Sequence, residues 1–334
     1  MSSILTNASA MTALKSLQST NRSLETTQAR ISTGLRVGQA SDNAAYWSIA
    51  TTMRSDNKAL TTVQDALGLG AAKVDTAYTG MNAAIHLVDE IKTKLVAARE
   101  PGVDRAKIQA EITALQGQIT SNAAASSFSG ENWLSVDSSV ANYNPAKSMV
   151  ASFTRAADGT VSVSTISVDT LTIKLLDAAT DAAAAGTGIL DAKYTSAPTT
   201  GPPAFAAGQR LTDQSTALGA TVFNVISLNI SALTNSAGDL TTLESYIKGV
   251  DDSIGRMTTA ASDLGAVKKR IDLQSEFVSN LKDTIDRGVG TLVDADMNKD
   301  STRLQALQVQ QQLGIQALSI ANGNSQTILS LFRG

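Results

Sequence analysis

The sequence contains no cysteine and a single histidine among its 334 residues. Without cysteine the chain can form no disulfide, no thiolate nucleophile and no cysteine-ligated zinc site. One imidazole alone disfavours histidine-based metal sites and proton relays. The composition therefore argues against most enzyme chemistries, and we expect neither a cofactor nor a bound metal.

A basic surplus and long apolar runs are also missing. Lysine and arginine total 27 against 30 aspartates and glutamates, a net charge of −3, so the positive surface that nucleic acid requires is absent. No stretch approaches the roughly 18 uninterrupted apolar residues of a membrane span, and Met1–Gln18 has no continuous apolar region of a secretory signal. We expect no nucleic-acid partner, no membrane insertion, and export, if any, without a cleaved signal.

Aromatic residues and prolines are few and unevenly placed. Aromatics make up 4 % of the chain, and all 5 prolines lie between residues 101 and 203. Proline interrupts helix interiors, so both ends of the chain are free to form long helices. Their cores must come mainly from alanine, leucine, isoleucine and valine.

Two long heptad seams flank the middle of the chain. Apolar or small residues recur at alternating spacings of three and four from Leu60 to Ala98, and again from Leu240 to Leu292, where we expect the stripe to shift beside the polar Lys268. A shorter helix is expected to follow the Pro101-Gly102 turn and fold back on the first. The predicted tube-packing positions are Leu60, Val63, Leu67, Val74, Met81, Val88, Ile91, Leu95, Ile254, Met257, Leu264, Ile271, Val278 and Ile285.

The extreme ends carry thinner apolar stripes, interrupted by polar residues such as Asn21 and Gln311. An isolated helix of this kind is marginal in water. We infer that these ends become ordered by packing on other chains; the alternative is that they pair with one another within one chain. The predicted inter-subunit positions are Leu14, Leu17, Leu24, Ile31, Leu35, Leu304, Leu307, Gly314, Leu318, Ala321, Ile328 and Phe332.

The middle of the chain alternates with a period of two. Val150 to Val163, with Asp158-Gly159 at its centre, predicts a β-hairpin, and strands are also expected at 171–175 and 222–230. Residues 178–208 predict a surface loop with one short helix. The fold class is therefore mainly α: a long, coiled-coil-like helical bundle made by both chain ends, with a small β-containing central domain.

No group of residues predicts catalysis. His86 has no second ligand in helical register and is expected at a solvated position. Asp294, Asp296 and Asp300 are expected to be acids at a helix start. The run Lys268–Arg270 predicts a solvated face with pairs along its own helix.

Three stretches resemble bacterial flagellin. Residues 31–45 (ISTGLRVGQASDNAA) are similar to the point where a first helix ends in Ser-Ser-Gly-Leu-Arg and a second begins at Ala-x-Asp-Asp-Ala-Ala. Residues 128–134 (FSGENWL) and the far end from Val293 to Leu331 resemble two further segments of that family, in its alphaproteobacterial branch. In the first stretch we expect a turn and helix cap built from Gly34, Arg36, Gly38, Ser41 and Asp42.

The resemblance implies a secreted structural subunit of the bacterial flagellar filament that serves swimming motility. Residues 1–40 and 296–334 would form the filament's inner core, 41–134 and 236–295 a helical outer tube, and 135–235 a variable domain facing solvent. The subunit would be exported unfolded, and its ends would fold on polymerisation.

The implied partners are copies of the same chain, alone or mixed with other flagellins, the flagellar type III export apparatus with a chaperone, and the filament cap and hook-junction proteins. Flagellins sensed by the animal flagellin-recognising Toll-like receptor carry Arg and Glu before a Leu in the first long helix. Ile91 and Lys94 stand there instead, which argues against that receptor as a partner.

Three other interpretations remain open at this point. A hook-filament junction protein has similar ends. A coiled-coil signalling protein of chemoreceptor type would share the seams but would need a membrane anchor. A catalytic central insert is the third, although residues 135–235 contain no His-Glu-x-x-His motif.

Overall fold

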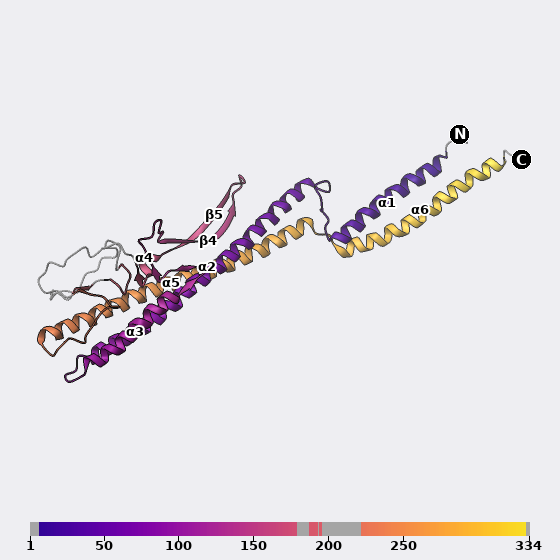
Figure 1. Ribbon diagram of the computed structural model, residues 1–334. Coiled ribbons are helices and arrows are strands. Elements are labelled where there is room, and N and C mark those ends of the chain that lie inside the picture. The colour runs from indigo at the N-terminus through magenta and orange to yellow at the C-terminus, as the bar shows by residue number, and fades with distance from the viewer. Residues whose placement is uncertain (1–6, 179–186, 193, 196–221, 332–334) are drawn as a thin grey trace. The chain divides into compact units, whose positions relative to one another are not determined.

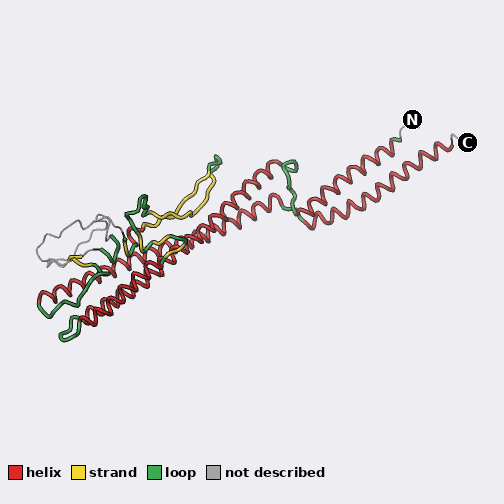
Figure 2. Tube along the Cα trace, in the orientation of Figure 1, coloured by secondary structure: helices red, strands yellow, loops and turns green. Residues whose placement is uncertain are grey.

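The computed structural model describes residues 7–178, 187–192, 194–195 and 222–331. These residues are mainly helical, with short strands in the middle of the chain (Figures 1 and 2), so the predicted fold class is confirmed. The chain divides into two compact units: Met1–Ala59 with Asn280–Gly334, and Leu60–Ser279. The predicted three-part division stays a prediction.

The first unit is built around helices α1 (Ala8–Thr33) and α6 (Met297–Leu331), which lie side by side (Figure 1). They run antiparallel, because Asn7 donates to the carbonyl of Ala321 while Asn21 accepts from Gln311. Within this one chain, therefore, the two ends pair with one another, which was the alternative left open by the sequence.

The second unit contains most of α2 (Ala44–Ala97), α3 (Arg105–Ala125) and most of α5 (Ala237–Val293). Asp75 with Lys268 and Lys92 with Asp251 are ion pairs of 2.5 and 2.6 Å that align α2 and α5 antiparallel. The Asp104 side chain accepts from two backbone N–H groups at the start of α3, as an N-cap does. The predicted helix after Pro101-Gly102 is confirmed.

The predicted hairpin is also confirmed. Strands β4 (Ala146–Arg155) and β5 (Val161–Asp169) pair antiparallel, and the turn between them has Gly159 at a φ of +87°. The remaining strands are short: β1 (Ser127–Phe128) with β2 (Glu131–Asn132), β3 (Ser135–Val136) with β6 (Leu176–Asp177), and β7 (Tyr194–Thr195) with β8 (Val222–Phe223).

The strand predicted at 171–175 is wrong. The side chain of Asp169 accepts from the backbone N–H of Leu171 and starts the single helical turn α4 (Thr170–Ile173). A local side-chain-to-backbone bond of this kind competes with strand pairing. Most of the loop predicted at 178–208 lies outside the described residues.

The strand predicted at 222–230 is confirmed only at Val222–Phe223. Beyond it, Val225, Leu228 and Ile230 are buried, but no strand pairs with them within the described part of the chain. Two buried glutamines of α3 take the partner's place: Gln116 donates to the carbonyl of Val225, and Gln109 accepts from the N–H of Ile230. Buried backbone groups need partners, and here amide side chains supply them.

A buried ion pair joins α4 to β6. The Nζ atom of Lys174 lies 2.7 Å from Oδ2 of Asp177, and their side chains are 2 % and 0 % exposed. Burial alone would raise the pKa of Asp177, but hydrogen bonds from Lys174, Thr187 and Ser138 outweigh it and hold that pKa well below its ordinary value. The carboxylate is therefore charged at neutral pH and is stabilised by this network.

Candidate functional site

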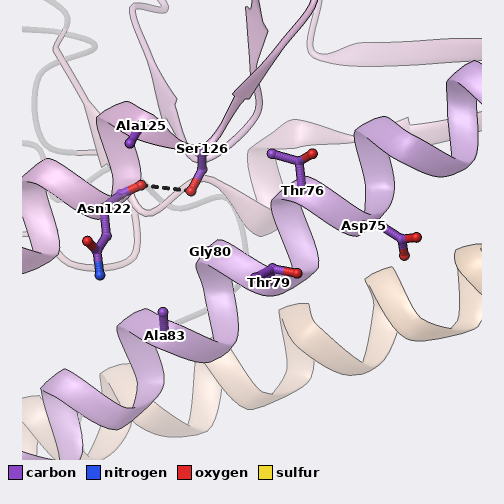
Figure 3. A pocket seen from close by; sticks show the side chains of 8 residues that line it. All are labelled: Asp75, Thr76, Thr79, Gly80, Ala83, Asn122, Ala125 and Ser126. Carbon is purple, nitrogen blue, oxygen red and sulfur yellow. Dashed lines mark hydrogen bonds between the residues drawn. The ribbon is translucent and has the colours of Figure 1, made fainter.

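A hollow in the second unit lies between α2 and the end of α3 (Figure 3). It is an open groove of about 530 Å³ lined by Asp75, Thr76, Thr79, Gly80, Ala83, Asn122, Ala125 and Ser126. Asp75 is paired with Lys268, and the Ser126 hydroxyl donates to the carbonyl of Asn122. Asp75 is the one ionisable side chain among these lining residues, and its pairing with Lys268 occupies the only carboxylate beside the hydroxyls of the groove.

The part of the chain that the structure describes also contains no cluster of metal ligands and no helix suited to spanning a membrane. Across that part of the chain no three histidine, aspartate or glutamate side chains are grouped as metal ligands. None of the helices described is both long and apolar enough to cross a bilayer. His86 is exposed, as the sequence predicts.

Of the three acids expected at a helix start, Asp300 lies in the first turn of α6 as predicted, whereas Asp294 directly follows the end of α5, so the prediction is wrong for Asp294. Asp296 accepts from the N–H groups of Asn298 and Lys299 at the start of α6, which confirms its position as a helix-start acid. Lys268 pairs with Asp75 on α2. Lys268 also interacts with Asp272 along its own helix, as predicted, and the pair with α2 is a contact that the sequence analysis did not predict.

The predicted tube-packing residues lie inside the molecule. Ile254 and Ile285 are half-buried, and the other twelve are buried. Ile285 belongs to the first unit, where it packs on a cluster of Val37, Ala50, Val289 and Val293. These positions form the cores of single chains, and their role in packing between subunits stays a prediction.

The predicted inter-subunit residues of the ends divide differently. Leu307 is buried, Leu14 is 44 % exposed, and Leu17, Leu24, Ile31, Leu35, Leu304, Gly314, Leu318 and Ala321 are half-buried. A Cβ atom added at Gly314 would lie 3.2 Å from Cδ1 of Leu17, so glycine lets α1 approach α6 closely. Phe332 and the side chain of Ile328 lie outside the described residues.

A second apolar row on α6 was missed by the sequence analysis. Val309, Leu313, Ile315 and Ile320 are 55 %, 57 %, 54 % and 67 % exposed, and Met11 of α1 is 55 % exposed. A helix with apolar residues on more than one side is normally covered on each of them. The spacing of Val309, Leu313 and Ile320 is a signal in the sequence, but the predicted seam runs through Leu304, Leu307 and Leu318 instead. The α1–α6 pair therefore leaves an apolar surface open.

The turn between α1 and α2 closes on the junction of α5 and α6. Gly34 has a φ of +71° and its N–H donates to the carbonyl of Arg30, which ends α1. The N–H of Arg36 donates to the carbonyl of Val293 at 2.7 Å, and its guanidinium donates to that of Leu292 at 2.8 Å. These bonds fix the two halves of the first unit to each other.

The predicted cap at Ser41 or Asp42 is wrong. Asn43 caps α2, since its side-chain oxygen accepts from the N–H of Tyr46. The carboxylate of Asp42 instead accepts from the N–H groups of Gly38 and Gln39, which precede it in the loop. Asp and Asn side chains both form caps and turns, and the sequence alone did not show whether Asp42 or Asn43 adjoins the helix.

These features define a class: a helical structural protein whose paired terminal helices leave an apolar surface uncovered. Comparison with known proteins agrees. Residues 4–139 match the bacterial flagellin N-terminal helical region, and residues 247–332 the bacterial flagellin C-terminal helical region. Flagellin C of Rhizobium meliloti strain 1021 is 52 % identical over 334 residues, Flagellin A of Rhizobium meliloti 48 % over 397, and the flagellin of Brucella melitensis 46 % over 335, with 100 % of both chains covered in each case.

The chain belongs to the bacterial flagellin family. It is a secreted structural subunit of the flagellar filament, a helical polymer that serves motility. The predicted family and function are thereby confirmed, and nothing favours the hook-junction or signalling alternatives.

Proposed function

We propose that copies of this chain assemble through the open apolar surface of the α1–α6 pair. The observation that carries this proposal is the exposed row of Val309, Leu313 and Ile320, which the single chain does not cover. Burying one such side chain contributes about 1.5–3 kcal/mol. Covering several of them by neighbouring copies would supply the free energy for polymerisation.

The half-buried positions predicted from the sequence have a related role in this proposal. Leu17, Leu24 and Leu318 are half-buried, so in this proposal one side of each faces the paired helix and the other side would adjoin neighbouring copies. The pairing of α1 and α6 would then be weak in a lone subunit and firm in the polymer, since an amphipathic helix with half of its apolar surface uncovered is marginal. Folding of the ends would thus be coupled to assembly.

We further propose the assignment of residues 1–40 and 296–334 to the filament core, 41–134 and 236–295 to its outer tube, and 135–235 to the solvent side. Family membership supports this assignment. It also supports the flagellar type III export apparatus, an export chaperone, the filament cap and the hook-junction proteins as partners, and a purely structural role without catalysis.

Leu313→Asp tests the proposed surface. Leu313 is 57 % exposed, so the charge should leave the lone subunit folded while raising the critical concentration for polymerisation by about tenfold or more. Val140→Asp is the matched control, because Val140 is 58 % exposed and lies in the central loop between β3 and β4. Sedimentation and electron microscopy of both variants give the readout. Normal polymerisation of Leu313→Asp would refute the proposal.

A further inference from the structure

The start of α2 is an exposed helix without charge. Residues 44–53 (AAYWSIATTM) contain no charged side chain. Ala50 is buried and Met53 is half-buried against the cluster around Val37, whereas the other eight residues are exposed. A helix that faces solvent normally carries charged residues on its open side. This segment therefore has the composition of a helix that is covered.

Three large side chains at the start of α2 are exposed to solvent. Tyr46, Trp47 and Ile49 are 40 %, 39 % and 46 % exposed. Tryptophan and tyrosine are the residue types most enriched at the centres of protein interfaces. The open face of this helix start is thus suited to an apolar contact with another protein surface.

The charges in the loop before α2 do not favour a charged partner. The loop before α2 contains two charged residues, Arg36 and Asp42. Arg36 donates to the carbonyl of Leu292, and Asp42 accepts from the N–H groups of Gly38 and Gln39. Both charges are engaged by the chain's own backbone. Recognition at Tyr46 and Trp47 would therefore rest on apolar contact.

We infer that Tyr46, Trp47 and Ile49 form a contact patch for a second copy of this chain in the polymer. The inference rests on the proposed function, since a second copy is the one protein that every subunit of a homopolymer meets. The patch belongs to the same compact unit as the α1–α6 pair, so assembly of that unit brings neighbouring copies to it. Its residues belong to α2, whereas the apolar row belongs to α6, so the patch would be a contact additional to that row.

Tryptophan fluorescence measures this contact directly, because the chain has 2 tryptophans. Trp133 is 3 % exposed, so quenching of the wild-type chain by acrylamide reports mainly on Trp47, and Trp47→Phe supplies the Trp133 background. We expect the quenching constant of Trp47 to fall about threefold or more between subunit and polymer, as for an interface residue that becomes fully buried. The constant for Trp133 should not change.

A substitution provides the second arm. Trp47→Glu should raise the critical concentration by about tenfold, while Val140→Glu should leave it unchanged, with circular dichroism checking that both subunits keep their helix content. If Trp47→Glu does not fold, the quenching comparison decides. Polymers in which Trp47 stays as accessible as in the subunit would overturn the inference, as would protection by phosphatidylglycerol vesicles but not by polymer. Failure of the wild-type chain to polymerise would instead contradict the proposed function.

Discussion

Lys174→Met removes the ammonium group that neutralises the buried Asp177 carboxylate. The two side chains are 2 % and 0 % exposed and their charged atoms lie 2.7 Å apart, so water cannot replace the lost partner. Breaking a buried ion pair by removing one member costs about 3–5 kcal/mol. Because Ser138 still donates two hydrogen bonds to Asp177, we expect the lower end of that range.

Urea unfolding in a Trp47→Phe background measures this cost. The remaining Trp133 precedes Leu134, whose carbonyl accepts from the N–H of Leu175 at 2.8 Å, so its fluorescence reports on the region around the ion pair. Lys248→Met is the control: its pair with Glu244 is 68 % and 46 % exposed, and such pairs contribute about 0–1 kcal/mol. Equal losses of stability in the two variants would refute the reasoning.

Two further predictions concern the second unit. Gly249→Ala should destabilise it by about 1 kcal/mol, because the new Cβ would lie 2.8 Å from Cζ of Phe223. Gly255→Ala on the same helix should stabilise it by about 0.5–1 kcal/mol, because nothing lies within 4 Å of the new Cβ. Thermal unfolding midpoints that shift in the same direction for both variants would contradict this. Asp177→Asn should destabilise the unit at pH 7, and the difference in stability from wild type should vanish in acid. The pKa of Asp177 is lowered in the folded state. The stability that the charged carboxylate contributes is therefore complete above the ordinary pKa of 3.8 and is lost as the pH falls through the pKa of the folded state. A difference that persists unchanged in unfolding experiments at low pH would disprove the assignment.

Long-range periodicity made most of the helical fold predictable from the sequence. The heptad seam from Leu60 predicted the buried face of α2, because a repeat sustained over many turns outweighs local preferences. The hairpin was equally predictable, since Asp158-Gly159 sets its turn. In both cases the local signal and the tertiary structure agree.

The errors arose where a side chain settled a local choice. Asp169 turned a predicted strand into a helical turn, and Asn43 took the cap expected at Ser41 or Asp42. The glutamines of α3 that hold the segment after β8 act across more than 100 positions of sequence, and no periodicity points to such a contact.

The surfaces that we propose for association could be predicted from the sequence only in part. Leu17 and Leu318 follow the seam through which α1 and α6 meet, and the sequence analysis found them. Leu313 and Trp47 lie outside it, and we propose them as association residues because they are exposed in the folded chain. Exposure is a property of the tertiary structure and cannot be read from one helix at a time.

Removal of either terminal helix tests the central claim most directly. Chains lacking residues 1–33 or residues 297–334 should keep the helix content of the second unit, measured by circular dichroism, and should remain unpolymerised in sedimentation and electron microscopy at concentrations at which the full chain forms filaments. Long filaments formed by either shortened chain would contradict the claim that the paired ends carry the assembly surface.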